Sequence, residues 1–515
     1  MPKLTIDNIP VEVRDGTTIL EAALSCGIHI PMLCFLKGHD ASTSCLVCAV
    51  RVNSAARLVP ACATVATSGM VVESESDDVR SARKLALELL LGDHLGDCLA
   101  PCQNACPAHM DIPTMIRAIA DARWEDAIAV VKEAIPLPAI LGRICPNLCE
   151  RACRRTQHDA AVSICYLKRV VADTDLARPS PYLPTCAEPN GYNVAIVGAG
   201  PAGLSAAYFL QCAGCACTIY DEAELPGGTL RSSIAEGILP RAVLDAEIAS
   251  IARVGIHFVP STRIDSVMAI EALRTEFSAV VLACGKQMAT DVSPLSVVID
   301  TASVTKRSHA TLLQNLFISG LPTKHAVQAV AAGASVARAV MDYLQIKYAN
   351  ESRFSVHIGR LHEEEMRQML AEVNPASRLT TASSDSLGLS LEEARVEAER
   401  CLHCDCRKLH TCKLRDYAID YGAQANRFKG ERRTLSIDWS HQDLVYESGK
   451  CIDCGLCVQI AADAKEALGL TFIGRGFTVR LAAPFGANLV DALRLVGFTC
   501  ADACPTGALA RKAGQ

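Results

Sequence analysis

The stretch YNVAIVGAGPAGLSAAYFLQCAGCACTIYDEAELPGG, residues 192–228, decides the fold of the middle of the chain. Its apolar run at 194–197 predicts a buried strand, and the turn GAGPAG leads into LSAAYFLQ, which predicts a helix. A second strand is expected at 217–220, ending at Asp221. This order is the dinucleotide-binding fingerprint: glycine N–H groups and the helix N-terminus bind a pyrophosphate, and the acid binds ribose hydroxyls. The alternative is a glycine-rich turn without a ligand.

The fingerprint defines the residues expected to contact the dinucleotide. They are Gly198, Gly200, Pro201, Ala202, Gly203, Asp221, Glu222, Gly227, Gly228 and Gly320. Their spacing alone does not separate FAD from NAD(P). The wider sequence, with VAIVGAGPAGLSAA, TIYDEAELPGGTL, GILP and AVVLACGK, resembles the flavin-binding half of the glutamate synthase small-subunit family. The resemblance implies an FAD-binding Rossmann-type domain over residues 192–345.

The NADPH-binding unit of that family has no counterpart in this sequence. In the family it follows the strand that corresponds to 277–284. Here only about thirty residues separate Gly285 from LFISG at 316–320, and a segment of that length is too short for a βαβ nucleotide fold. The segment also contains no second glycine-rich turn. We therefore expect bound FAD and no nicotinamide site on this chain.

Cysteine dominates the composition: the 515 residues include 26, with a net charge of −6. The length suggests roughly three to five domains. The N-terminus MPKLTIDNIP is not a signal peptide, and no apolar run reaches the roughly eighteen residues of a membrane span. Without a basic patch, nucleic acid is not an expected partner. We expect a cytoplasmic protein whose cysteines bind metal rather than form disulfides.

The first cysteine group lies in residues 1–80, after an alternating strand pattern and an amphipathic helix. Cys34, Cys45, Cys48 and Cys62 have the spacing C-x10-C-x2-C-x13-C. Four thiolates suit the two irons of a [2Fe–2S] cluster, with zinc as the alternative. The segment resembles the ferredoxin module of the complex I large iron–sulfur subunit and of related hydrogenases. The resemblance implies a ferredoxin-like β-grasp fold.

The second group lies in residues 81–171, within a predicted helical region. It resembles the helical two-cluster domain of the glutamate synthase small subunit and of dihydropyrimidine dehydrogenase. The resemblance implies one [4Fe–4S] cluster on Cys98, Cys102 and Cys153 and a second on Cys106, Cys145 and Cys149. We expect His94 as fourth ligand of the first, because a His-x3-Cys pair also occurs in complex I. Lys168 replaces the family's remaining ligand, so Cys165 is expected to complete the second; a surface histidine and a buried thiol are the alternatives.

The third group follows a linker (172–191) and the nucleotide domain, in a helical connector at 346–430. Cys401, Cys404, Cys406 and Cys412 have the spacing C-x2-C-x1-C-x5-C, which favours [4Fe–4S] over zinc. The lead-in EEARVEAERCLHC resembles the entry to the cluster domain of glutamate synthase relatives, displaced to the other end of the chain.

The last group occupies residues 431–515. Cys451, Cys454 and Cys457 follow the ferredoxin pattern C-x2-C-x2-C, and Cys504, followed by proline, is the remote fourth ligand of a [4Fe–4S] cluster. The segment resembles the C-terminal ferredoxin-like fold of complex I and hydrogenase large subunits. Ala461 stands where a second cluster would need a cysteine, so one cluster is expected.

The whole chain is thus predicted to be multidomain, α+β and α/β, with one [2Fe–2S] cluster, about four [4Fe–4S] clusters and FAD. No acid–base constellation stands out, so the cofactors carry the chemistry. The leading hypothesis is an electron-transfer subunit of a larger soluble oxidoreductase, with a flavin/NAD(P)-binding subunit, a hydrogenase or formate dehydrogenase subunit, or ferredoxin as partners; electron bifurcation stays open. The alternatives are a stand-alone NAD(P)H-dependent oxidoreductase and a non-enzymatic assembly scaffold.

Overall fold

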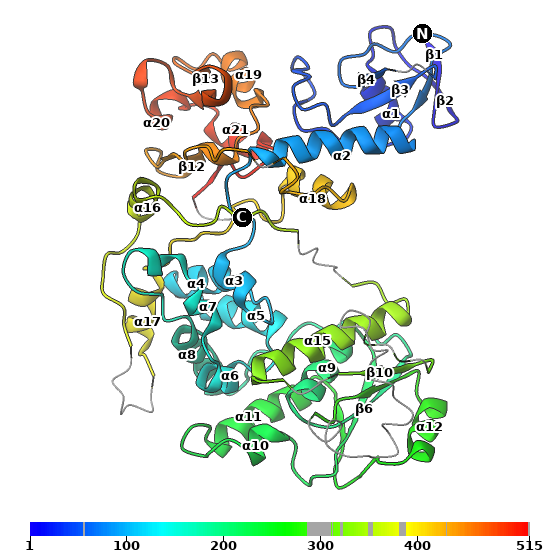
Figure 1. Cartoon of the computed structure of the whole chain (residues 1–515), viewed down its shortest axis with the longest axis vertical. Helices are drawn as coiled ribbons and strands as arrows, with labels where there is room; N and C mark the ends of the chain where they lie inside the picture. Colours follow the sequence, from blue (N-terminus) through cyan, green and yellow to red (C-terminus); the bar gives the residue numbers. More distant parts are fainter. Residues whose placement is uncertain are drawn as a thin grey trace. The chain divides into compact units, whose positions relative to one another are not determined.

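Two compact units make up the chain, and the second is inserted into the first. The computed structural model describes residues 1–54, 57–285, 309, 311, 313–319, 323–348, 354–380, 388–428 and 430–512. Unit 1 consists of Met1–Leu99, Ser352–Glu372 and Cys404–Gln515. Unit 2 consists of Ala100–Glu351 and Val373–His403. Figure 1 gives the element labels used below.

Unit 1 begins with a mixed five-stranded sheet. Its strands are β1 (Lys3–Ile6), β2 (Ile9–Glu12), β3 (Ala49–Val52), β4 (Leu58–Pro60) and β5 (Val71–Glu73), in the order β2-β1-β5-β3-β4. β1 runs antiparallel to β2 and parallel to β5. Helix α1 (Ile19–Ser25) starts at a capping box of Thr18 and Glu21 and buries Ile19 and Leu20 in the core of this sheet. A sheet packed on one helix is the arrangement expected for a β-grasp fold.

The rest of unit 1 surrounds a long helix and a small C-terminal sheet. Its helices are α2 (Asp77–Gly92), α16 (Glu363–Leu370), α18 (Lys413–Asp420), α19 (Leu456–Asp463), α20 (Leu489–Ala492) and α21 (Gly497–Ala503), with short 3-10 turns at Ser448–Lys450, Gly476–Thr478 and Pro484–Gly486. Its strands are β11 (Ile437–Asp438), β12 (Leu444–Glu447) and β15 (Leu509–Arg511), which form one antiparallel sheet, and the hairpin β13 (Thr471–Ile473) and β14 (Arg480–Ala482). Helices α2 and α18 pack together, although they lie far apart in the sequence.

Unit 2 begins with a helical domain. It contains α3 (Pro101–Ala105), α4 (Ile112–Ala120), α5 (Trp124–Ala134), α6 (Pro138–Ile144), α7 (Leu148–Arg151), a 3-10 turn at Arg154–Gln157 and α8 (Ile164–Leu176). Helix α17 (Leu391–Ala398), yellow in Figure 1, returns from the C-terminal side of the sequence and packs on α4 and α8. Asp111 caps α4 by accepting a hydrogen bond from the Thr114 N–H at 3.2 Å.

A parallel Rossmann-like sheet forms the rest of unit 2. Its strands are β6 (Asn193–Val197), β7 (Ala216–Tyr220), β8 (His257–Val259), β9 (Ala279–Leu282) and β10 (Leu316–Ile318), in the order β10-β9-β6-β7-β8. Its helices are α9 (Pro201–Cys212), α10 (Thr229–Ser232), α11 (Arg241–Ala252), α12 (Val267–Glu276) and α15 (Ala326–Tyr343). β6 lies between β7 and β9, so the loop after β6 sits where the strand order changes direction, which is where ligands bind in such sheets.

The helical domain and the sheet share one hydrophobic core, so unit 2 is a single packed body. The buried carboxylate of Glu247 on α11 accepts hydrogen bonds from the Ala139 and Ile140 N–H groups at 2.6 and 2.8 Å, at the start of α6. Burial raises the pKa of Glu247 to about 7, although these two hydrogen bonds oppose the shift. No helix in the described part of the chain is long and apolar enough to cross a membrane.

Candidate cofactor sites

The glycine-rich turn between β6 and α9 leaves space beside its backbone for a ligand. Gly198 has a φ of +107°, and its N–H donates to the Tyr220 carbonyl at 2.7 Å. At Gly203 a Cβ atom would lie 1.9 Å from the Gly198 carbonyl oxygen, so only glycine fits. At Gly200 a Cβ would meet no atom within 4 Å, which leaves room for a phosphate against the N-terminus of α9. Pro201 and Ala202 form the first turn of that helix.

Asp221 holds this turn as well as facing the expected ribose position. Its Oδ2 accepts from the Ala199 N–H at 2.5 Å and its Oδ1 from the Ala223 N–H at 2.8 Å. A carboxylate offers about four lone-pair positions, so ribose hydroxyls can still donate to it. The neighbouring Glu222 is exposed and pairs with Arg263 at 3.4 Å.

The second glycine pair packs directly on the first turn. The Gly227 N–H donates to the Ala199 carbonyl at 2.9 Å, and a Cβ at Gly228 would lie 2.9 Å from the Gly200 Cα. Both glycines have positive φ, +129° and +52°. The structure therefore brings the predicted nucleotide residues together around one cradle, and this cradle fits a dinucleotide. Gly320 lies outside the described residues.

The four N-terminal cysteines converge in unit 1. Cys34, Cys45, Cys48 and Cys62 are all nearly fully buried. The sulfurs of Cys34 and Cys45 lie 3.3 Å apart, and their hydrogen bond lowers the pKa of Cys34 to about 6 and raises that of Cys45. Cys62 lowers the pKa of Cys48 to about 7 in the same way. Thiols that lose their protons near neutral pH are suitable ligands for iron.

The C-terminal cysteines line one apolar pocket in unit 1. All four predicted ligands, Cys451, Cys454, Cys457 and Cys504, border it, together with Leu481 and Phe472. Gly455, with a φ of +78°, turns the chain between the second and third cysteine. Burial raises the pKa of Cys454 to about 12, because the pocket cannot solvate a thiolate without a cation. The donor set fits a [4Fe–4S] cluster.

A further set of four predicted ligands meets in unit 2. The pKa of Cys145 is raised by a hydrogen bond with Cys165 and by burial. Lys168, one turn after Cys165 on α8, is 3% exposed. Burial disfavours its ammonium, but Cys165, Cys145, Cys149 and Cys106 outweigh burial and raise the pKa of Lys168. The structure thus brings Cys106, Cys145, Cys149 and Cys165 close to the buried Lys168. From the sequence, this lysine was considered only as a residue that cannot bind iron.

The boundaries between the two units fall within two of the predicted ligand groups. Cys98 belongs to unit 1, whereas Cys102 and Cys153, its expected co-ligands, belong to unit 2. The third group is likewise divided, because Cys401 belongs to unit 2 and Cys404, Cys406 and Cys412 belong to unit 1. In the described part of the chain, no three His, Cys, Asp or Glu side chains are arranged to hold a single metal ion. A four-iron cluster instead spreads its ligands over four irons.

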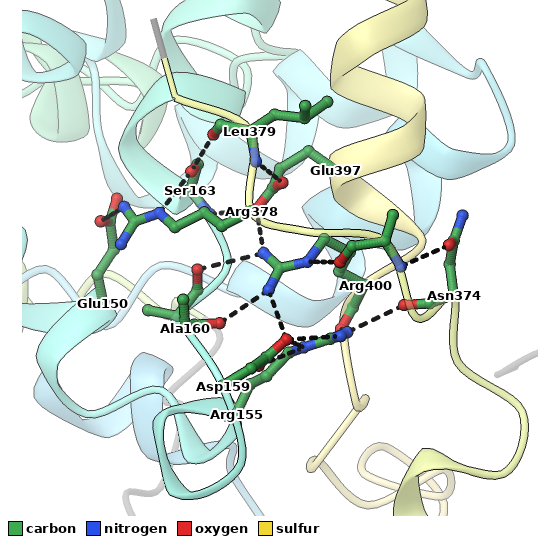
Figure 2. A network of polar contacts seen from close by, with 12 residues as sticks. Glu150, Arg155, Asp159, Ala160, Ser163, Asn374, Arg378, Leu379, Glu397 and Arg400 are labelled. Carbon is green, nitrogen blue, oxygen red and sulfur yellow. Dashed lines mark hydrogen bonds and ion pairs between the residues drawn. The ribbon is translucent and has the colours of Figure 1, made fainter.

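A network of buried charges fixes the start of α8, where Cys165 lies (Figure 2). The Glu150 carboxylate accepts from the Cys165 N–H at 2.9 Å, and Glu397 accepts from the Ser163 N–H at 2.8 Å. Negative charges at a helix N-terminus are stabilised by its unpaired N–H groups and dipole. Arg378 donates to Glu150 at 2.5 Å, and Arg400 donates to Glu397 at 2.7 Å.

Figure 2 also shows how this network joins two distant segments of unit 2. Arg155 donates to Asp159 at 2.8 Å and to the carbonyl of Arg400 at 2.5 Å. Arg400, Arg155 and Glu397 are 0–1% exposed, so these charges lie in the interior. Segment 388–403, which contains Cys401, is thereby fixed to the helical domain that contains Cys153. Sequence reasoning missed this network; the alternation of acids and arginines in EEARVEAER was its only signal.

Comparisons with known protein families identify three domains in the chain. Residues 2–77 match the family described as a 2Fe-2S iron-sulfur cluster binding domain. Residues 96–179 match dihydropyrimidine dehydrogenase domain II, a 4Fe-4S cluster domain, and residues 196–255 match an NAD(P)-binding Rossmann-like domain. The predicted [2Fe–2S] domain, the helical 4Fe–4S domain and a Rossmann-like nucleotide-binding domain are therefore confirmed.

Several curated relatives are oxidoreductase subunits. The NADPH-Fe(3+) oxidoreductase subunit beta of Geobacter sulfurreducens is 41% identical over 191 residues, 36% of this chain and 28% of the relative. The NADP(+)-dependent formate dehydrogenase subunit beta of Moorella thermoacetica is 38% identical over 207 residues, 36% of this chain and 29% of the relative. The matches cover less than half of the relatives' length. Among solved structures, an NAD+-reducing [NiFe]-hydrogenase aligns over 99% of this chain and 88% of its own, with 14% identity and a TM-score of 0.36.

Proposed function

We propose that the chain is an electron-transfer iron–sulfur flavoprotein subunit of a larger oxidoreductase. One observation supports this most directly: three cysteine groups of unit 1 share a single hydrophobic core. Cys34 and Cys45 of the first group, Cys98 and Cys412, and Cys454 of the last group all belong to it. Clusters on these groups would be close neighbours in an apolar medium, which is the arrangement of a one-electron relay.

Electrostatic contacts support the same view. Burial is the largest cause of the raised pKa of Cys454, followed by the charge of Cys504, and Cys34 makes a smaller contribution. The first and last cysteine groups of unit 1 therefore interact electrostatically. Cys504 in turn contributes to the raised pKa of Cys412. Cluster potentials respond to neighbouring charge and burial, so clusters this close would also tune one another.

We infer that the cradle of unit 2 binds FAD. The open backbone at Gly200 would accept the pyrophosphate, and Asp221 would orient the ribose while holding Ala199 in the turn. Bound flavin would supply the exchange between electron pairs and single electrons. The protein's own part is to bind and orient it and to keep the neighbouring thiol of Cys284 protonated, since burial and then Asp221 and Glu222 raise the pKa of that thiol to about 11.

The names of the relatives indicate the kind of partner. They are beta subunits of an NADPH-Fe(3+) oxidoreductase and of an NADP(+)-dependent formate dehydrogenase. We infer that this chain also works beside a subunit that handles NAD(P)H or the terminal substrate. The second candidate is an oxidoreductase that takes NAD(P)H directly, and the NAD(P)-binding family match over 196–255 favours it.

Anaerobic reduction of the isolated chain separates the two. We expect dithionite to bleach the cluster absorbance and excess NADPH or NADH to leave it unchanged within minutes, because the only described nucleotide cradle is assigned to FAD. Rapid bleaching by either nicotinamide would reject the subunit proposal in favour of the direct reductase. Acid extraction of the same sample should release FAD; its absence would reject the flavin assignment.

A further inference from the structure

We propose that His94, Cys98, Cys406 and Cys412 hold one [4Fe–4S] cluster, built where the two sequence segments of unit 1 on either side of the insertion meet. This ligand set replaces both groupings expected from the sequence for these residues. It identifies the ligands of one electron-transfer cluster, and it rests on the proposed function for the electron-carrying role of that cluster.

The backbone holds Cys98 and Cys406 together. The Cys406 N–H donates to the Cys98 carbonyl at 3.1 Å, and the Cys98 N–H donates to the Val356 carbonyl at 3.2 Å. Both cysteines are buried, at 6% and 7% exposure. A Cβ at Gly507 would lie 2.5 Å from the Cys406 sulfur, so a glycine is needed to make room for that thiol.

Cys412 completes a group of three buried thiols. It lies at the N-cap of α18, is 5% exposed and shares a hydrophobic core with Cys98. Ionising three neighbouring thiols in an apolar interior is unfavourable unless a cation binds the thiolates. Soft metal centres such as iron–sulfur clusters are the cations that thiolates bind preferentially.

His94 supplies an unsatisfied fourth donor. Its side chain is 8% exposed, and its Nδ1 has no hydrogen-bond partner among the described residues. Such a buried, unpaired nitrogen is unfavourable unless something binds it. A neutral imidazole with an unpaired nitrogen is the form of histidine that binds metals.

Lys450 links the histidine with the cysteines. The Leu95 N–H donates to the Gly449 carbonyl at 2.6 Å, and a Cβ at Gly96 would lie 2.7 Å from the Lys450 side chain. The same ammonium acts on His94, Cys98 and Cys406. Lys450 is buried and paired with Glu447, so a positive charge stands beside the site and offsets part of a cluster's negative charge.

Pulsed EPR on the full chain, purified anaerobically and reduced, tests the ligand set. We expect one [4Fe–4S] signal with a strong nitrogen hyperfine coupling, which changes on ¹⁵N-histidine labelling and is lost in His94→Ala. Cys98→Ser and Cys406→Ser should each remove this same signal, whereas Cys102→Ser and Cys404→Ser should leave it. The [2Fe–2S] signal serves as the internal control for folding of unit 1.

Two results would overturn the proposal. Loss of one common signal in Cys98→Ser and Cys102→Ser, with a different signal lost in Cys406→Ser, would restore the grouping expected from the sequence. Absence of any histidine nitrogen coupling, with all clusters present, would exclude His94. Failure of the proposed function is a separate outcome, because bleaching by NADPH alone would reject the subunit role and leave the ligand signals unchanged.

Discussion

Replacing Arg400 with methionine should release segment 388–403 from the helical domain of unit 2. The Arg400 guanidinium donates to Glu397 at 2.7 Å, to Asp159 at 3.1 Å and to the Ala160 and Ala376 carbonyls at 3.0 and 2.8 Å. The side chain is fully buried. Methionine has a similar apolar stem, so Arg400→Met removes the charge and the donors and keeps most of the volume.

The magnitude follows from what the substitution leaves behind. Glu397 is itself fully buried, and its two oxygens also fix the Ser163 and Leu379 N–H groups at 2.8 and 2.7 Å, so it cannot turn to water. Removing one partner of a buried ion pair costs about 3–5 kcal/mol. Because Asp159 keeps Arg155 as a partner, we expect about 4 kcal/mol for the docking of this segment, at the middle of that range.

Hydrogen exchange read out by mass spectrometry measures this directly. A loss of about 4 kcal/mol corresponds to roughly a thousandfold faster exchange of the amides in α17, where opening is local. Arg395→Met is the matched control, since Arg395 lies on the same helix, is 39% exposed and pairs with the exposed Glu392 at 3.2 Å. Exposed pairs contribute about 0.2–1 kcal/mol, so exchange should rise less than about fivefold.

Equal exchange rates in the two variants would refute this reasoning. They would mean that the buried pair is no more important for docking than a surface pair. Exchange that rises equally throughout unit 2 would also refute it, because the network is expected to hold one segment rather than the whole unit.

Three further predictions concern single residues. Gly200→Val should leave unit 2 folded but free of FAD, because a side chain there meets only the expected pyrophosphate position. Gly203→Val should instead unfold the sheet, because a Cβ there would collide with the Gly198 carbonyl oxygen. The FAD content and the circular dichroism spectrum of the two variants distinguish these outcomes. Lys168→Met should lower the midpoint potential of the neighbouring cluster, by roughly 170 mV at most in an EPR-monitored titration, since unit charges about 4 Å apart interact by about 4 kcal/mol at an effective dielectric constant of 20; an unchanged potential would contradict this. Glu247 has a raised folded-state pKa of about 7, so its contribution to stability is complete below about pH 4.5 and is lost as the pH rises through 7; α6 amides of the native chain should therefore exchange progressively faster, relative to Glu247→Gln at the same pH, over that window, and a constant ratio would contradict it.

The nucleotide fold was predictable almost residue by residue, because each element of the fingerprint answers a local constraint. Gly198 needs a positive φ, and Gly203 has no space for a side chain. Cys215 and Cys217 pack in the core at β7, where a cluster would disrupt the strand. Cysteines close in sequence, such as Cys451, Cys454 and Cys457, were also predicted to meet, and they do.

Partners distant in the sequence were less predictable. The family resemblance grouped Cys98 with Cys102 and Cys153, and nothing local reveals that the Cys406 N–H donates to the Cys98 carbonyl across the inserted unit. Glu397 and Arg400 have the pattern of a charged surface helix, yet both are fully buried. Their role depends on Asp159 and Ser163, which approach only when the chain returns to the helical domain.

The interrupted sequence of unit 1 has a consequence for biosynthesis. Cys98 leaves the ribosome roughly 300 residues before Cys406, and at about 5–20 residues per second the delay is roughly 15–60 s. During this interval α2 is exposed without α18, the helix that later covers it. The nascent N-terminal segment therefore stays incomplete while the inserted unit is synthesised, and, under the proposed ligand set, iron delivery to Cys98 and Cys406 would be among the last events of maturation.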